Sequence, residues 1–191
     1  MNVWFSADQH FQHANIIRYS HRPFTNVAEM DERLVSNWNE RVGPKDTVYH
    51  LGDLIFRATP QQAAELLSRL HGQICLVRGN HDAVAERHKE RFTWIKDLAE
   101  IKIADAGAPD GWQRIVLCHY AMRVWNRSHY GTWSLFAHSH GSLPDDPHSL
   151  SLDVGVDVWN YAPVSYEEIK ERMLHKQFVP VDHHGQKNEV E

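Results

Sequence analysis

Seven short apolar segments of this chain have the length and the β-branched and aromatic content of β-strands. Five of the seven lead into Asp, Asn or His side chains that are suited to binding metal. Ligands of open α/β sheets bind at the carboxyl ends of the strands, so we expect these polar side chains to lie together. The predicted strands cover residues 2–7, 47–51, 73–77, 100–104, 114–118, 133–136 and 150–154.

Helical patterns alternate with the early strands and predict a partly parallel sheet covered by helices. Each predicted helix begins at or after a residue that commonly caps a helix N-terminus. Long helical patterns are missing between the later strands, which favours antiparallel or mixed pairing there. The predicted helices cover residues 26–42, 60–70 and 166–174, and their capping residues are Asn26, Thr59 and Ser165.

The length and composition are those of a globular domain. The 191 residues are 42% hydrophobic and 24% charged, near the averages of globular proteins. We expect one domain over residues 1–181 and a polar C-terminal tail over residues 182–191. The formal net charge of −5 argues against strong nonspecific binding to nucleic acid. No apolar stretch approaches the ~18 residues of a membrane span, and the N-terminus lacks the basic segment of a signal peptide.

The two cysteines indicate the compartment. Cys75 and Cys118 both lie inside apolar runs and are predicted to be buried thiols, as in a reducing environment such as the cytoplasm. Cys118 should point away from its neighbour His119, because successive side chains of a strand face opposite sides. Cys118 is therefore not counted as a metal ligand.

Histidine is unusually frequent, with 15 residues, and four of these follow predicted strands. Together with two aspartates and one asparagine they make seven candidate metal ligands, too many for one tetrahedral ion. They suit two ions roughly 3.5–4 Å apart that share a carboxylate. Residues two apart face one side of extended backbone, which predicts that the members of each Asp-x-His or His-x-His pair converge. The seven candidates are Asp8, His10, Asp53, Asn80, His119, His138 and His140.

The charges of such a site predict what it binds. Two divalent ions, two aspartates and a bridging hydroxide leave about one positive charge, so the site should attract an anion such as a phosphate ester. Nitrogen and oxygen ligands without thiolate favour Mn, Fe, Co, Ni or Zn over Mg or Ca. Gly52 and Gly79 allow sharp turns just before Asp53 and Asn80.

Five ordered blocks of this sequence resemble the calcineurin-like metallophosphoesterases, and residues 15–17, 22–24 and 155–157 look like the small bacterial and phage members. The resemblance implies an α/β (α+β) fold, a four-layer α-β-β-α sandwich of two mixed β-sheets with helices outside. The blocks are Asp8-x-His10, Gly52-Asp53, Gly79-Asn80-His81-Asp82, His119 and His138-x-His140.

The resemblance also implies roles for the residues beside the ligands. His81 would be the catalytic histidine that protonates the leaving oxygen or stabilises the phosphoryl group, with Asp82 orienting it. Arg57 would contact phosphate, and His13 would line the entrance. The implied ligand sets are Asp8, His10, Asp53 and His140 for one metal ion, and Asp53, Asn80, His119 and His138 for the other.

Two residues depart from the family pattern. Ala137 replaces the Gly that usually precedes the His-x-His block, which should mainly restrict the turn. Phe56 replaces the acidic residue that some phosphoprotein phosphatases place before the Arg, which weakens a protein-phosphatase assignment.

Several residues have a purely structural interpretation as well as a functional one. Arg57 could equally form a surface salt bridge, and His13 could be a solvated loop residue. His50 could hydrogen-bond a ligand or be a satisfied core histidine. The aromatic residues Trp125, Tyr130 and Trp133 could stack a nucleobase of a nucleotide substrate, although core packing is the simpler interpretation.

The predicted function is a two-metal phosphoesterase in which a metal-bridging hydroxide attacks phosphorus and His81 assists the leaving group. A phosphodiester is favoured over a monoester because the short chain has no evident cap domain. A phosphomonoesterase or protein phosphatase, a mononuclear metal site and a non-catalytic scaffold on the same fold stay open, as does the oligomeric state. Intact ligands and His81 disfavour the scaffold. Gly141-Ser142 after His140 disfavours a β-lactamase-like hydrolase, which uses a His-x-His-x-Asp-His run.

Overall fold

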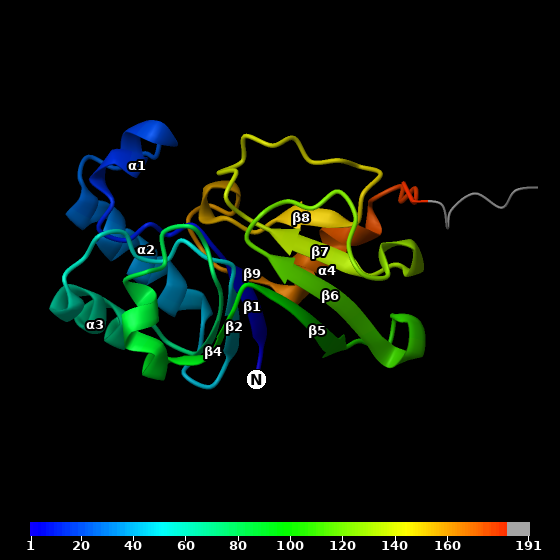
Figure 1. The fold of residues 1–191 in the computed structure, drawn as a ribbon, viewed down its shortest axis with the longest axis horizontal. Helices are drawn as coiled ribbons and strands as arrows, with labels where there is room; N and C mark the ends of the chain where they lie inside the picture. Colours follow the sequence, from blue (N-terminus) through cyan, green and yellow to red (C-terminus); the bar gives the residue numbers. More distant parts are fainter. Residues whose placement is uncertain (183–191) are drawn as a thin grey trace, which may run out of the picture.

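The computed structural model describes residues 1–182, which form two mixed β-sheets flanked by helices, as predicted (Figure 1). Apart from Asp182, the predicted tail lies outside the described residues. Among the described residues, no helix combines the length and the apolar character needed to cross a membrane.

The first sheet has the strand order β4-β3-β2-β1-β9. Strands β1 to β4 run parallel, and β9 pairs with β1 in the antiparallel sense. Neither β4 nor β9 was expected, since β4 follows a 3-10 turn directly and β9 has only two residues. The bounds are β1 Val3–Ser6, β2 Thr47–His50, β3 Gln73–Val77, β4 Phe92–Lys96 and β9 Val164–Ser165.

The second sheet has the order β5-β6-β7-β8 and confirms the mixed pairing expected of the later strands. Strands β5 and β6 are antiparallel, whereas β7 runs parallel to both β6 and β8. Only Asp97 separates β4 from β5, so the chain passes from one sheet to the other at this residue. The bounds are β5 Leu98–Ala104, β6 Trp112–Cys118, β7 Trp133–Phe136 and β8 Ser151–Asp153.

The three predicted helices are present, and a short fourth helix, α1, was not expected. Helices α2 and α3 cover the outer face of the first sheet, and α4 packs against β1, β8 and β9 (Figure 1). The capping predictions are confirmed, because each capping side chain accepts a hydrogen bond from a backbone N–H of the first turn. The helices are α1 Ala14–Tyr19, α2 Val27–Arg41, α3 Pro60–Arg69 and α4 Tyr166–Leu174, with 3-10 turns at Ala85–Arg91, Pro109–Gly111, Ser128–Tyr130 and Val156–Val158.

Two apolar clusters hold these layers together. One fills the space between the sheets and includes Phe5, Ile115 and Leu135, all fully buried. The other lies between the first sheet and helices α2 and α3, with Trp38 and Ile74 at its centre. Burial of each such side chain contributes roughly 1.5–3 kcal/mol. Because the two clusters share the first sheet, they fix both the helical layer and the second sheet relative to its strand ends.

The inter-sheet cluster also accounts for residues whose role was open. Trp125 and Trp133 belong to it and are buried, so they have no access to a nucleobase in the cavity described below. Cys75 is buried as predicted. Cys118 is only half-buried, contrary to the prediction, because it ends β6 and pairs with the exposed Leu98 at the start of β5.

Candidate metal centre

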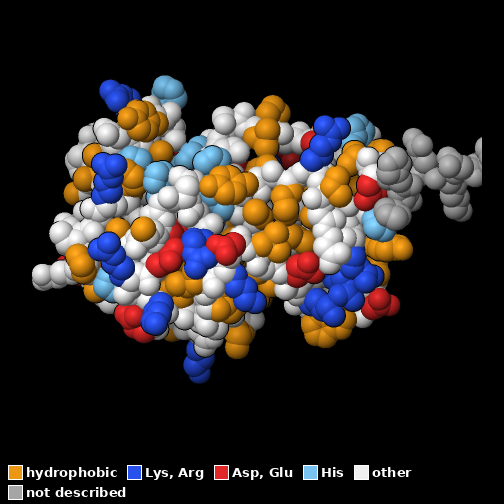
Figure 2. Space-filling model, viewed as in Figure 1, with side chains coloured by type: hydrophobic (Ala, Val, Ile, Leu, Met, Phe, Trp, Pro, Cys, Tyr) orange, Lys and Arg blue, Asp and Glu red, His pale blue; other side chains and the backbone are white. Residues whose placement is uncertain are grey.

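The candidate ligands follow β1, β2, β3, β6 and β7 and lie together where the carboxyl ends of the two sheets meet. Histidine side chains gather at this edge, between α1 and the second sheet (Figure 2). A cavity of about 800 Å³ opens beside them. The ligands that line it are His10, Asp53, Asn80, His138 and His140.

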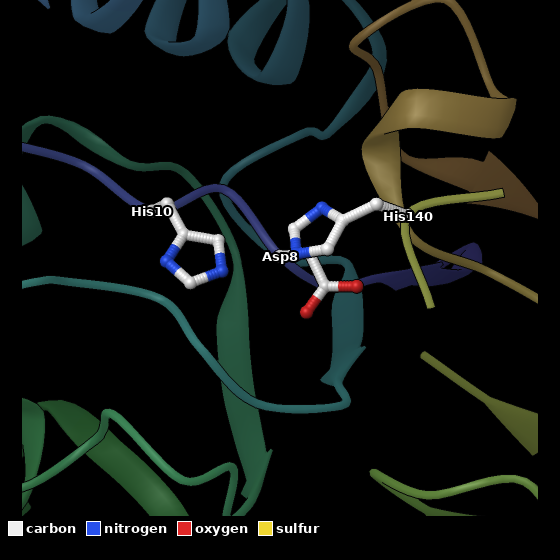
Figure 3. A group of neighbouring side chains, drawn as sticks. All are labelled: Asp8, His10 and His140. Atoms are coloured by element: carbon white, nitrogen blue, oxygen red, sulfur yellow. The ribbon is translucent and has the colours of Figure 1, made fainter. Parts of the chain in front are cut away.

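The first group that could hold a metal ion combines residues from both sheets. Asp8 and His10 follow β1, and His140 follows β7. The side chain of His140 comes from a different segment of the chain than those of Asp8 and His10, and it points toward them (Figure 3). One ligand atom of each lies within 4.8 Å of those of the other two.

The second group consists of Asp53, His119 and His138, and it also draws on both sheets. Asn80 adjoins this group, because its Oδ1 lies 3.2 Å from Nε2 of His119. The Oδ2 atom of Asp53 lies 3.4 Å from Nε2 of His10 and 3.7 Å from Nε2 of His119. Asp53 therefore stands between the two groups, where a shared carboxylate would be.

Unsatisfied atoms in the first group show that its residues suit a cation. Oδ1 of Asp8 and Nε2 of His10 are buried and have no hydrogen-bond partner among the described residues. Burial, and then the nearby Asp53 carboxylate, raise the pKa of Asp8 well above its ordinary value. Burial, and then His140, lower the pKa of His10. A divalent ion would satisfy both atoms and relieve the repulsion between the carboxylates.

Hydrogen bonds orient three of the ligand imidazoles so that each Nε2 faces the centre. Nδ1 of His119 donates to the carbonyl oxygen of Leu51 at 2.6 Å. Nδ1 of His140 lies 2.7 Å from Oδ2 of Asp157, and Nδ1 of His10 lies 3.2 Å from Nδ1 of His13. Fixing the tautomer through the other nitrogen in this way is usual for metal-binding histidines.

The backbone at the ligands differs from the extended conformation that the residue spacing suggested. Five of the seven candidates have positive φ angles, so neither i, i+2 pair lies in extended backbone; the predicted convergence is confirmed for Asp8 and His10, which share the first group, and is wrong for His138 and His140. The chain turns sharply as soon as each strand ends. As a result, His138 and His140 enter different groups. The five residues are Asp8 (59°), His10 (51°), Asp53 (58°), His138 (69°) and His140 (47°).

Two glycines let the loops after β2 and β3 touch. A Cβ atom on Gly52 would lie 2.5 Å from the backbone nitrogen of Gly79. A Cβ atom on Gly79 would lie 2.3 Å from Oδ1 of Asp53. Both separations are shorter than van der Waals contact, so only glycine permits the approach that sets Asp53 beside Asn80.

Asp82 holds this pair of loops together. Its carboxylate accepts hydrogen bonds from the backbone N–H groups of Asp53 (2.9 Å), Leu54 (2.9 Å) and Gly79 (2.7 Å). The expectation that Asp82 orients the imidazole of His81 is therefore wrong, because backbone amides occupy both of its oxygens. Asp82 instead positions Asp53, whose Oδ1 accepts a hydrogen bond from the backbone N–H of His81 at 2.9 Å.

The remaining predicted site residues surround Phe56 on the cavity wall. The ring of His13 stacks on Phe56 at 3.8 Å between centroids, and the ring of His81 meets it edge-on at 5.0 Å. The guanidinium of the exposed Arg57 lies 5.0 Å from the centre of the same ring. His13 is buried rather than solvated, and its contact with His10 makes it a support for that ligand.

His50 is a hydrogen-bonded core histidine that also supports the site. Its Nδ1 accepts a hydrogen bond from the backbone N–H of Gly52 at 3.2 Å, and its Nε2 contacts Oε1 of Gln9. Complete burial lowers the pKa of His50 to about 3, so this residue stays neutral. The interpretation as a satisfied core histidine is confirmed, whereas the hydrogen bonds of the His50 ring go to Gly52 and Gln9, neighbours of the ligands, and not to a ligand itself.

A buried ion pair that sequence reasoning missed supports the first group. Arg22 donates two hydrogen bonds, each 2.8 Å, to the carboxylate of Asp157, and Asp157 orients His140. Arg22 also donates to the carbonyl oxygen of Asp8 at 2.6 Å. Burial alone would raise the pKa of Asp157, but its hydrogen bonds from His140 and Arg22 hold that pKa below the ordinary value.

Asp157→Asn is expected to weaken metal binding as well as stability. Loss of the carboxylate leaves Arg22 buried without a charge partner, which costs roughly 3–5 kcal/mol. It also frees the His140 imidazole, which should lower metal affinity by about 10- to 100-fold. Chemical denaturation and metal titration measure the two effects separately. Glu32→Gln, which breaks an exposed pair with Arg69, is the control, and unchanged affinity in Asp157→Asn would restrict Asp157 to a structural role.

Helix α2 anchors the ligand loop from the opposite side through Asp31. This buried carboxylate accepts hydrogen bonds from the backbone N–H of Gln12, at 3.2 Å to each oxygen, and from its side chain at 2.6 Å. Burial raises the pKa of Asp31 to about 6, although the bonds from Gln12 oppose this shift.

Asp31→Asn is expected to stabilise the metal-free protein at pH 8 and to leave it nearly unchanged near pH 3. The folded state binds the Asp31 proton more tightly than the unfolded state, so wild-type stability falls as the pH rises from about 4 to above 6. The free energy of unfolding of the wild type should fall by about 1–3 kcal/mol over this pH range. Urea denaturation across this range measures it. Glu32→Gln, which removes an exposed carboxylate whose pKa Arg69 lowers, should show no such gain.

Comparisons with known proteins agree on one family. The model of the calcineurin-like phosphoesterase family matches residues 1–172. An uncharacterized protein of Methanocaldococcus jannaschii is 36% identical over 173 residues, which cover 87% of this chain and 88% of that protein. The gene 66 protein of Mycobacterium phage L5 is 26% identical over 91% of this chain and 95% of its own.

A solved structure has the same overall arrangement. The crystal structure of a protein of unknown function from Aquifex aeolicus superposes with a TM-score of 0.63 at 26% identity, covering 89% of this chain and 98% of that one. Together with the two ligand groups at the sheet edge, these matches identify the chain as a member of the calcineurin-like phosphoesterase family.

Proposed function

We propose that this protein is a two-metal phosphoesterase that prefers phosphodiesters. The observation that carries the proposal is the pair of ligand groups with Asp53 between them, beside a cavity that also contains His81 and Arg57. We assign Asp8, His10, Asp53 and His140 to one divalent ion and Asp53, Asn80, His119 and His138 to the other. When bound, the two ions activate water and neutralise charge on the phosphoryl oxygens.

The charge of the cavity supports an anionic substrate. Among the described residues that line it, Asp53 is the sole carboxylate, and the ions would neutralise that charge. No ion pair joins Arg57 to a carboxylate within residues 1–182, and its guanidinium rests on the ring of Phe56. Its donors are therefore free to bind phosphoryl oxygens.

His81 is the residue that we propose to assist the leaving group. Its backbone is tied to Asp53, and its half-buried ring lines the cavity 5.6 Å from the ring of His10. The ring can therefore reach a phosphate ester at the ligand groups while staying outside them. With Phe56 beside it in place of a carboxylate, His81 has no acidic partner of the kind found in some protein phosphatases.

The preference for diesters rests on the size and openness of the site. The cavity of about 800 Å³ is much larger than a phosphate group and has room for two ester arms. A phosphomonoesterase is the second candidate, since the same ligand groups would serve it. Manganese, iron, cobalt, nickel and zinc all suit the proposed nitrogen and oxygen ligands.

The decisive experiment compares an aryl phosphate diester with the matching monoester. Metal-free protein is supplemented in turn with Mn²⁺, Ni²⁺, Co²⁺, Zn²⁺ and Mg²⁺, and bound metal is counted alongside hydrolysis. We expect about two ions per chain and faster turnover of bis(p-nitrophenyl) phosphate than of p-nitrophenyl phosphate. Failure to cleave either ester with two ions bound would overturn the proposed function and favour a binding scaffold.

A further inference from the structure

One wall of the cavity takes no part in the proposed chemistry. It is formed by α1 and the two residues that follow it, and we call the lining residues Asn15, Ile16, Tyr19, Ser20 and His21 the α1 wall. The side chains of Asn15, Ser20 and His21 make no hydrogen bond within the described part of the chain. Their donors and acceptors are therefore available to a ligand.

Tyr19 is an exposed aromatic residue in the wall of this cavity. It is 61% exposed, whereas most large hydrophobic residues of the protein are buried. The guanidinium of Arg18 lies over its ring, 5.2 Å from the centre, and His13 meets the ring edge-on at 6.3 Å. Because a planar ring has two faces, this exposure leaves one open for stacking.

Ring contacts place Tyr19 at a defined separation from the ligand groups. The ring of His10 lies 5.1 Å from that of His13, which lies 6.3 Å from that of Tyr19. The ring of Tyr19 contacts that of His13 and not that of His10 itself, so a group that contacts Tyr19 while its phosphate sits at the ligand groups has to reach beyond the ligand imidazoles. The substituent on the phosphate has to be longer than a methyl group and to end in something that packs against an aromatic ring.

The chemistry of the α1 wall favours a nucleoside over other substituents. One open ring beside amide, hydroxyl and imidazole groups matches a flat heterocycle with polar edges. An acyl chain would need a wall that is apolar throughout, whereas here Ile16 and Tyr19 are interspersed with the polar Asn15, Ser20 and His21. A cationic head group is disfavoured, because no carboxylate lies on this wall among the described residues and the positive guanidinium of Arg18 already lies over the Tyr19 ring.

We propose that the α1 wall binds the nucleoside arm of a phosphodiester, with its base stacked on Tyr19. This inference rests on the proposed function, because the phosphate of the same molecule occupies the ligand groups. It assigns nucleotide recognition to Tyr19 rather than to Trp125 and Trp133, which are buried between the sheets.

The test uses two diesters with one leaving group, methyl p-nitrophenyl phosphate and thymidine 5′-(p-nitrophenyl phosphate). Their ratio of kcat/KM isolates the nucleoside arm, since the chemical step releases the same alcohol from both. We expect the thymidine ester to be favoured and Tyr19→Ala to lower that preference by roughly 5- to 100-fold, the range for loss of one stacked base. Tyr19→Phe should retain the preference because it keeps the ring.

A binding measurement separates recognition from turnover. The affinity of the protein for thymidine 5′-monophosphate, relative to methyl phosphate, should fall by a similar factor in Tyr19→Ala. Tyr130→Ala, which removes another exposed tyrosine outside this cavity, should change neither ratio.

The two proposals fail in distinguishable ways. Equal kcat/KM for both diesters in the wild type, or a thymidine preference unchanged in Tyr19→Ala, would overturn the assignment of the α1 wall and leave the phosphoesterase intact. Absence of hydrolysis of both diesters would instead overturn the proposed function. Tight binding of thymidine 5′-monophosphate that depends on Tyr19 would then still support the α1 wall as a nucleotide site.

Discussion

Asp53→Asn is expected to abolish phosphodiester hydrolysis while making the metal-free protein more stable. Oδ2 of Asp53 lies within 3.7 Å of imidazoles in both ligand groups, so its charge serves both proposed ions. Without that charge, bound metal should fall from about two ions to one or fewer. The ions contribute several kcal/mol to stabilisation of the transition state, so activity should drop at least ~10³-fold.

The gain in stability follows from the same geometry. The Asp53 carboxylate helps to raise the pKa of the buried Asp8, after the larger effect of burial, so the two carboxylates repel each other when no cation separates them. Their repulsion lowers the stability of the metal-free protein at neutral pH, where carboxylates are ionised in the unfolded chain. Removing one charge should therefore stabilise that form by about 1 kcal/mol.

Thermal denaturation with and without a chelator tests both effects together. In chelator, Asp53→Asn should unfold at a higher temperature than the wild type; in excess metal the order should reverse, because only the wild type gains stability from two bound ions. Asp97→Asn removes an exposed carboxylate at the connection between β4 and β5 and should alter neither metal content nor activity. Two ions and full activity in Asp53→Asn would contradict the assigned role of this residue.

His81→Ala is expected to reduce kcat by roughly 10²- to 10⁴-fold while bound metal stays constant. The contact of His81 with Asp53 uses the backbone N–H, which alanine keeps, so the Asp53 loop should hold its place. The loss should therefore reflect the imidazole alone. Activity assays with two diesters of different leaving-group basicity, together with metal analysis, measure it.

The size of the loss should depend on the leaving group. If His81 protonates the departing oxygen, a phenyl ester should suffer more than a p-nitrophenyl ester, whose alcohol leaves readily without a proton. Equal losses on the two esters would show that His81 binds the phosphoryl group instead. His148→Ala changes an exposed histidine outside the cavity and should have no effect on either ester.

Sequence patterns could predict those parts of the fold and site that depend on local signals. The caps at Asn26, Thr59 and Ser165 set the starts of three helices, because a capping side chain acts within one turn. Polar residues that follow apolar strands could be placed at one sheet edge from topology alone. The β4 and β9 strands lacked such signals, and so did the six residues of α1.

Pairings between distant segments could not be predicted in this way. Arg22 and Asp157 are separated by 135 residues, and nothing in the neighbourhood of either residue specifies the other. Asp82 stands next to His81 in sequence, yet its side chain serves the backbone of Asp53, because the turn after β3 directs it toward the loop after β2. Adjacency in the chain therefore suggested the wrong partner.

Aromatic residues were equally ambiguous, because stacking on a base and packing in a core require the same side chains. Trp133 faces the inter-sheet cluster, whereas Tyr19 lies open in the cavity wall. Phe56 was considered only as a missing carboxylate. In the structure its ring holds His13, His81 and Arg57 in place, a role that depends on neighbours from three segments of the chain.

The distribution of each ligand group over both sheets has a mechanical consequence. Because Asp8 and His10 belong to one sheet and His140 to the other, a bound ion cross-links the sandwich at its open edge, and the second group adds another such link. Metal occupancy is thereby coupled to sliding and opening of one sheet against the other. Amide hydrogen exchange near this seam should slow when metal binds, while exchange in α2 and α3, which contact one sheet alone, stays nearly constant.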